Sequence, residues 1–184
     1  MRSYQVFAGL APQHAEKMLT LLAEKAPAMF AQSLAAASAA LKARPIYLQR
    51  QPFAKRAEAV RRTLARVATN AIADEVLAVY FLECRKELLV EWLDLLDVKH
   101  KDGTLEADSP PPPSEKMLRD AFESFRAAGD DPDRELLLRA FAAQDAVEWP
   151  VLDALLTGSA PAAEKPTPAP AKSKPAPRRA RKPR

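Results

Sequence analysis

The stretch that decides the fold is residues 76–82, which read VLAVYFL and are the most apolar segment of the chain. On a helical wheel its side chains point in nearly every direction, and a helix that is apolar all round is a buried helix. Seven residues are far fewer than the roughly 20 that a membrane-spanning helix needs. We therefore predict a central buried helix over residues 71–98 and no membrane span. Its largely buried side chains should be Val79, Phe81, Leu82, Leu89, Trp92 and Leu96.

Helical periodicity continues on both sides of this stretch, and no segment shows the period-two alternation of a strand. Prolines, capping residues and glycines place the helix ends. The predicted helices cover residues 12–25, 27–43, 53–71, 71–98, 114–129, 132–144 and 150–156, with a turn at Asp102-Gly103. Two alternatives remain open for the third helix: it runs on into the fourth, or the chain bends near Thr69-Asn70. The sequence therefore predicts an all-α helical bundle of about six or seven helices.

Two of these helices show a clear core-facing pattern. In the helix over 27–43 the apolar face consists of Phe30, Leu34, Ala37 and Leu41. In the helix over 53–71, apolar residues recur at intervals of four and three, which is typical of a helix that packs on a core. They are Phe53, Ala57, Val60, Leu64, Val67 and Ala71.

Composition excludes several kinds of functional site. The 184 residues include four glycines, too widely spaced for GxxxxGK[ST] or GxGxxG, the loops that hold nucleotide phosphates. A single cysteine, Cys84, excludes an intrachain disulfide, a four-cysteine zinc site and a site of two cysteines and two histidines. The two histidines, His14 and His100, do not form HExxH. We predict a protein that is not an enzyme and that binds no cofactor or metal.

Acidic side chains form a stripe along the predicted central helix. Its members are Glu83, Glu87, Glu91, Asp94 and Asp97, and apolar residues fill the opposite arc. We interpret the stripe as a solvated face. The alternatives are a docking face for a basic partner, or a metal or enzyme site on this face or at His100.

Cys84 and His100 each have an ordinary interpretation and a functional one. Cys84 is predicted to be a buried, inert thiol, because about 24 Å of helix separate it from His100; geometry does not exclude His14 as a partner. His100 is predicted to be a cation near a helix C-terminus, followed by a turn. The functional alternative pairs it with Asp97, Asp102 or Glu106 in metal binding or proton transfer.

The charges are segregated along the chain. Residues 42–66 hold eight basic residues and one acid, a net charge of +7, and Tyr47, Gln49 and Gln51 add polar or stacking groups. Residues 67–158 have a net charge of −11. Two interpretations remain open: ion pairing between the basic segment and the acidic stripe, or a free face that neutralises phosphates.

A composition change after Gly158 divides the chain into a helical domain, residues 1–158, and a tail, residues 159–184. The tail has eight basic residues, one acid, seven prolines and no large apolar side chain, so it cannot offset its ordering entropy, and we predict that it is disordered. Its Lys/Ala/Pro composition resembles the tails of linker-histone-type DNA-binding proteins. The resemblance implies sequence-independent contact with DNA or RNA phosphates through Lys172, Lys174, Arg178, Arg179, Arg181, Lys182 and Arg184.

The predicted function follows from these features. We expect a non-enzymatic interaction or regulatory module whose bundle binds a protein partner and whose tail contacts nucleic acid. A purely protein-binding module with an incidental tail is the alternative. Residues 1–20 lack the apolar core of a secretory signal, and a free thiol fits a reducing compartment, which predicts a cytoplasmic protein. Its abundant alanine and arginine suggest a bacterial source.

Overall fold

Proline is the first residue of five of the ten α-helices that the structure describes. The computed structural model describes residues 1–107, 110–144, 147 and 149–158. This part of the chain contains ten α-helices, one 3₁₀ turn (η1), one π-helical segment (η2) and one short hairpin. The all-α prediction is confirmed, although the predicted number of helices is too low because two short helices, α1 and α4, were missed and the predicted helix over 71–98 divides into α6 and α7. No described helix is long and apolar enough to cross a membrane.

The first part of the chain forms a bundle of three longer helices and two short ones. One short helix precedes the bundle, and the other connects its second and third long helices. Its elements are α1 (Ser3–Gly9), α2 (Pro12–Lys25), α3 (Pro27–Ala40), α4 (Pro45–Gln49) and α5 (Phe53–Leu64). Helices α2, α3 and α5 pack on one another, and α4 packs on α3. The rings of Phe30 and Phe53 stack at 5.5 Å, and the Arg56 guanidinium lies over both rings. This contact fixes the start of α5 against α3.

The predicted central helix over 71–98 is not continuous. It consists of α6 (Asn70–Val79), η2 (Tyr80–Cys84) and α7 (Lys86–Leu95), with a break at Arg85, whose φ is −132° and ψ is 41°. The π segment widens the helix, so the side chains of α7 no longer continue the wheel of α6. Of the six predicted core residues, four are buried, whereas Val79 and Leu82 are only half-buried.

Two predicted core positions lie on the surface because their helices end early. Leu41 is 48% exposed because α3 ends at Ala40, and the chain then turns through Lys42 in a left-handed conformation. Val67 is 70% exposed because α5 ends at Leu64 and η1 (Val67–Thr69) follows. Ala71, the last member of the predicted face of residues 53–71, is also exposed.

A short hairpin follows α7, where no strand was predicted. Strands β1 (His100–Lys101) and β2 (Thr104–Leu105) pair in antiparallel fashion. The predicted turn lies between them: Asp102 and Gly103 both have positive φ, 54° and 88°. This is the Asp-Gly combination that a two-residue hairpin turn favours.

The last helices begin and end where the sequence predicts. They are α8 (Glu115–Ala127), α9 (Pro132–Ala143) and α10 (Pro150–Thr157). Ser114 caps α8 by accepting the Met117 N–H at 3.3 Å, and Asp131 caps α9 by accepting the Asp133 N–H at 3.0 Å. Gly158 ends α10 in the left-handed conformation.

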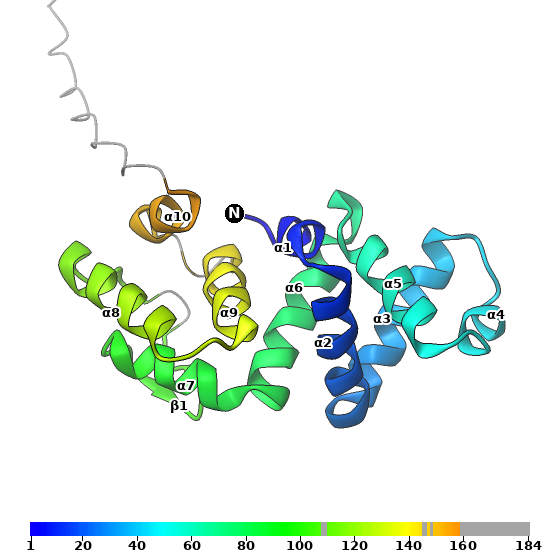
Figure 1. Cartoon of the computed structure of the whole chain (residues 1–184), viewed down its shortest axis with the longest axis horizontal. Coiled ribbons are helices and arrows are strands. Elements are labelled where there is room, and N and C mark those ends of the chain that lie inside the picture. The colour runs from blue at the N-terminus through cyan, green and yellow to red at the C-terminus, as the bar shows by residue number, and fades with distance from the viewer. Residues whose placement is uncertain (108–109, 145–146, 148, 159–184) are drawn as a thin grey trace, which may run out of the picture.

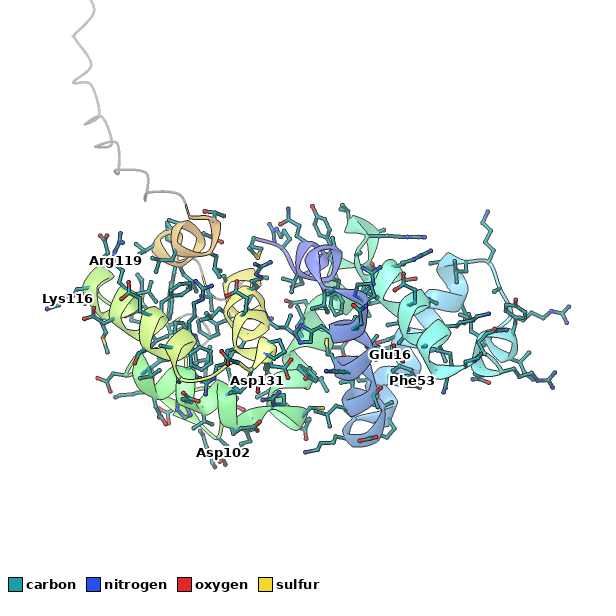
Figure 2. All side chains as sticks on the ribbon, viewed as in Figure 1. Glu16, Phe53, Asp102, Lys116, Arg119 and Asp131 are labelled. Atoms are coloured by element: carbon teal, nitrogen blue, oxygen red, sulfur yellow. The ribbon has the colours of Figure 1, made fainter. Side chains whose placement is uncertain are left out.

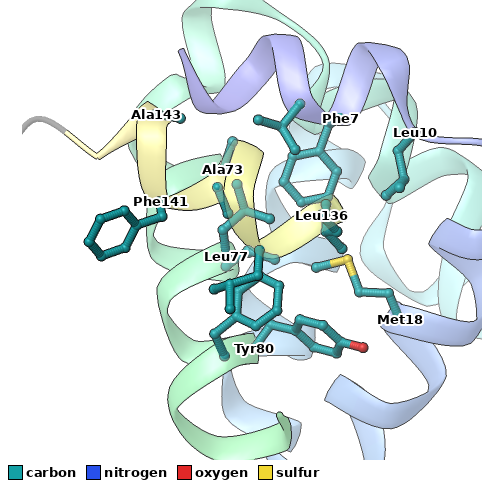
Figure 3. Close-up of a cluster of buried hydrophobic side chains, with 14 of the residues drawn as sticks. Phe7, Leu10, Met18, Ala73, Leu77, Tyr80, Leu136, Phe141 and Ala143 are labelled. Atoms are coloured by element: carbon teal, nitrogen blue, oxygen red, sulfur yellow. The ribbon is translucent and has the colours of Figure 1, made fainter. Parts of the chain in front are cut away.

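The molecule is elongated, and α6 joins its two ends (Figure 1). Helix α4 lies at one end of the long axis, while α8 and α10 lie at the other. Side chains from α1, α2, α6 and α9 meet between them, among them Phe7, Met18, Leu77 and Leu136 (Figure 3). All four are buried, so one hydrophobic core holds the two ends together.

Candidate nucleic-acid interface

The seven cations proposed to bind nucleic acid lie outside the described residues. Lys172, Lys174, Arg178, Arg179, Arg181, Lys182 and Arg184 all belong to residues 159–184. The candidate interface that the structure does describe is the basic segment, residues 42–66.

Six of the eight cations in this segment are exposed. Arg56 is engaged with the two phenylalanine rings, and Arg61 is largely buried and reaches the Leu10 carbonyl oxygen at 3.4 Å. The exposed cations are Lys42, Arg44, Arg50, Lys55, Arg62 and Arg66. Lys55 and Arg62 lie on α5, and the other four lie in the turns that flank α4 and α5. Figure 2 shows nitrogen-tipped side chains projecting from this end of the molecule.

Glu58 is the acid within this segment, and it neutralises only its neighbours on α5. It accepts hydrogen bonds from Arg61 Nε at 2.8 Å and Arg61 Nη2 at 2.9 Å, and from Arg62 Nε at 2.5 Å. These two guanidinium groups, Arg61 first, lower the pKa of Glu58 to about 2 despite the opposing effect of burial. Among the described residues, no ion pair engages the other five exposed cations, which are Lys42, Arg44, Arg50, Lys55 and Arg66.

Of the two interpretations left open for this segment, pairing with the acidic stripe is not found among the described residues. Glu87 pairs with Arg85 at 2.8 Å, and Glu91 accepts two hydrogen bonds from Arg134 at 2.8 Å each. Most of the stripe is exposed, as predicted for a solvated face. The two charged regions do not meet because α7 lies near α8, whereas α4 and the start of α5 lie at the other end (Figure 1).

The α4 region combines cations with exposed apolar groups, and we call this surface the α4 patch. It consists of Leu41, Lys42, Arg44, Ile46, Tyr47 and Arg50. Ile46 is 54% exposed and Tyr47 is 62% exposed, while Leu48 is buried and anchors α4. The sequence indicates Tyr47 as a possible stacking group, but exposure of Leu41 and Ile46 depends on where α3 and α4 end.

The other sequence candidates have structural partners. His100 Nε2 lies 3.0 Å from Asp94 Oδ1, and its Nδ1 accepts the Gly103 N–H at 3.3 Å. The pairing with Asp97, Asp102 or Glu106 that we considered is therefore not the one formed. Cys84 is buried near the Leu21 carbonyl oxygen, and burial raises the pKa of its thiol.

One group of polar residues was missed at the sequence level. Asp133 is buried on α9, and its carboxylate lies 2.7 Å from His14 Nε2 and 2.7 Å from the Tyr80 hydroxyl. Arg85 binds both this carboxylate and that of Asp131. These residues come from α2, η2, the break before α7 and the start of α9. Only the pair of acids at an N-cap, Asp131 and Asp133, hints at the group in the sequence.

Electrostatics favour the ionised form of the Asp133 carboxylate in the interior. Burial opposes the charge of Asp133, but hydrogen bonds from His14 and Tyr80 and the charge of Arg85 lower its pKa overall. Burial, with the adjacent Asp133 carboxylate, raises the pKa of Tyr80. The considered pairing of Cys84 with His14 is not the contact that Cys84 makes, which is with the Leu21 carbonyl oxygen. Leu21 lies seven positions beyond His14, which is roughly 10 Å along α2. The arrangement is a buried set of polar contacts between helices. Among the described residues, no cluster of three or more His, Cys, Asp or Glu side chains could hold a metal ion.

A cavity of about 280 Å³ lies where α6, η2, α7, the hairpin and α9 meet. Its lining is almost wholly aliphatic and aromatic, including Leu77, Phe81, Leu93 and Phe141. The Gln144 side chain at its edge already donates a hydrogen bond to Asp74 at 3.0 Å. No described residue of the lining carries a charge, so the cavity lacks a charged group that would orient a polar ligand.

Comparison with known proteins gives no relative for this chain. No protein-family model matches it, and no curated protein or solved structure matches it either.

Proposed function

We propose that this chain is a non-enzymatic helical module that binds nucleic acid without sequence preference. The basic end of the bundle and the cations of residues 159–184 would contact phosphates, and the acidic remainder of the bundle would be left for a protein partner. The observation that carries the proposal is the exposure of Lys42, Arg44, Arg50, Lys55 and Arg66 at one end, without an ion pair among the described residues.

Burial and charge support the phosphate interaction over internal pairing. A cation that is already paired gains little from a phosphate, whereas an unpaired, exposed cation releases a condensed counterion from DNA when it binds. The nearest carboxylate on α5, Glu58, is occupied by Arg61 and Arg62. The basic end therefore offers at least five cations for phosphate contacts.

The chain holds two groups of cations that are far apart in the sequence, residues 42–66 and residues 159–184. The α4 patch lies at one end of the long axis, and α10, after which the basic segment 159–184 follows in sequence, lies at the other (Figure 1). With the cations of residues 159–184 as a second group, one molecule would be able to contact two phosphate segments.

The test is the salt dependence of binding to a duplex of mixed sequence. For duplex DNA the slope of log K against log salt is about −0.9 per phosphate neutralised. The double variant Arg44→Ala, Arg50→Ala should make this slope about 1.8 less steep, if each arginine neutralises one phosphate.

The matched control is the double variant Lys116→Ala, Arg119→Ala, which removes the same charge from α8 at the opposite end (Figure 2). It should leave the slope unchanged. The proposal is wrong if the full chain binds neither DNA nor RNA at about 50 mM salt. In that case a protein-binding module becomes the better interpretation.

A further inference from the structure

We infer that the α4 patch binds single-stranded nucleic acid, with Tyr47 stacked on an unpaired base and Arg44 and Arg50 on the neighbouring phosphates. The inference rests on the proposed function and specifies the form of nucleic acid that this surface recognises.

The first observation is the density of exposed apolar groups. Leu41, Ile46 and Tyr47 lie within seven residues of each other and are all about half exposed or more. Isolated exposed apolar residues are ordinary, but these three share their surface with Lys42, Arg44 and Arg50. A surface that is both basic and apolar suits a partner with negative charges beside flat apolar groups, which describes an unpaired nucleotide.

The second observation is the geometry of α4. Arg50 follows Ile46 by four positions and Tyr47 by three, so these side chains share one side of the helix. Leu48 is buried on the opposite side and anchors α4 to the bundle. The Arg50 N–H donates to the Ile46 carbonyl at 3.2 Å, which continues the turn through Arg50. Tyr47 is therefore presented to solvent beside a guanidinium on a fixed backbone.

These features distinguish a single strand from a duplex. In a duplex the base faces are covered by their neighbours, so an exposed tyrosine ring finds no partner there. Helix α4 has five residues and is only about 7.5 Å long, which is short for a helix that reads a groove with several side chains. A single strand exposes base faces, on which aromatic side chains stack with little sequence preference.

An anionic membrane is the competing partner, and the same geometry disfavours it. Helices that lie in a membrane interface bury a long apolar face, whereas α4 offers about one and a half turns. The patch has only three apolar side chains, and one of them is a tyrosine between two arginines.

The experiment measures binding of the full-length protein to three probes by fluorescence anisotropy or flotation. The probes are a 20-nucleotide oligo-dT strand, a blunt duplex of 20 base pairs, and vesicles of phosphatidylcholine and phosphatidylserine. Tyr47→Ala should weaken oligo-dT binding about fivefold or more, the range that loss of one stacked base gives. It should change duplex binding less than twofold, and Tyr47→Phe should keep the oligo-dT affinity.

A control and a second readout keep the result specific. Val67→Ala removes another exposed apolar side chain, beyond the end of α5, and should leave all affinities unchanged. Oligo-dT carrying one 5-iodouracil should photo-crosslink to the tryptic peptide that ends at Arg50, and Tyr47→Ala should abolish this crosslink.

The outcomes separate the inference from the proposed function. If Tyr47→Ala binds both nucleic acids like the unaltered protein, the stacking inference is wrong and the phosphate-binding proposal stands. If neither nucleic acid binds at about 50 mM salt, both are wrong. Binding to the vesicles alone would overturn both in favour of a lipid surface.

Discussion

Tyr80 and Asp133 are 53 positions apart in the sequence, and the Tyr80 hydroxyl donates a hydrogen bond to Asp133 Oδ2 at 2.7 Å. The bond joins the π segment to the first turn of α9. His14 reaches the other carboxylate oxygen from α2. Three elements that are distant in sequence therefore meet at one buried carboxylate, between the basic and acidic ends of the molecule.

Removing the Tyr80 hydroxyl should destabilise the fold. Tyr80→Phe keeps the ring but removes a donor to a buried charged acceptor, which typically contributes about 1.5–3 kcal/mol. We expect a loss of that size in the free energy of unfolding, measured by urea denaturation. Tyr47→Phe is the matched control, because Tyr47 is exposed, and it should change stability by less than about 0.5 kcal/mol. Equal effects of the two substitutions would contradict the assignment.

Stability should fall in acid because of the same carboxylate. The pKa of Asp133 is lower in the folded protein than the ordinary value of about 3.9. Its ionised form therefore stabilises the fold at pH values above about 4, and the contribution is lost as the pH falls through the folded pKa. Asp131, paired with Arg85, has a lowered pKa and adds to the effect in the same direction. The free energy of unfolding should therefore decrease between about pH 5 and pH 2.

The variant Asp133→Asn tests the origin of this acid sensitivity. It should lower stability at pH 7 by about 3–5 kcal/mol, because it leaves Arg85 without one of its buried partners. It should also flatten the pH dependence. Asp102→Asn is the control, since Asp102 forms an exposed pair with Lys86, and such pairs contribute about 1 kcal/mol or less. A pH profile of Asp133→Asn that matches the unaltered protein would assign the acid sensitivity to other carboxylates.

Two leucines near the π segment should respond differently to truncation. Leu77 is fully buried in α6, whereas Leu82 is half-buried in η2. Leu77→Ala should cost about 2–5 kcal/mol, the usual range for a buried leucine, and Leu82→Ala should cost clearly less. Urea denaturation of both variants measures the difference. A larger cost at Leu82 would favour the continuous helix that the sequence predicts over the π segment.

Deleting residues 172–184 should affect binding but not folding. The deletion removes seven of the eight cations in residues 159–184. If five to seven of these cations neutralise phosphates, the slope of log K against log salt on duplex DNA should become less steep by about 4.5 to 6.3. The free energy of unfolding should change by less than about 0.5 kcal/mol, because Leu152 is the last buried apolar residue of the described core. An unchanged slope would remove these cations from the interface.

Sequence patterns predicted the long helices well because their ends carry local signals. Pro12, Pro27, Ser114 and Pro132 mark helix starts, and Gly158 marks an end. Each signal acts within one turn of the helix it starts or ends, so no tertiary contact is needed to interpret it. The short helices α1 and α4 were missed because five to seven residues show too little periodicity.

The central break could not be predicted from periodicity. VLAVYFL is apolar on all sides, so a wheel gives the same result for an α-helix and for a π segment. At the break, the Arg85 side chain binds the carboxylate of Asp133, a residue almost 50 positions away in the sequence. The candidate interface was found only in part: the cations and Tyr47 are visible in the sequence, but their lack of ion pairs depends on the distance between α5 and α7.

The opposite placement of charge has a consequence for the kinetics of association. Among the described residues, the cations of residues 42–66 lie around α4, and the acidic stripe lies on and beside α7, so this part of the chain has an electric dipole along its long axis. A polyanion attracts the basic end of this dipole and repels the acidic end, which favours approach with α4 leading, while the eight cations of residues 159–184 add an attraction of their own. Most association rates are limited by the need for two surfaces to meet in the right orientation, and rotation before contact reduces this limit. Added salt shortens the distance over which the charges act on the dipole.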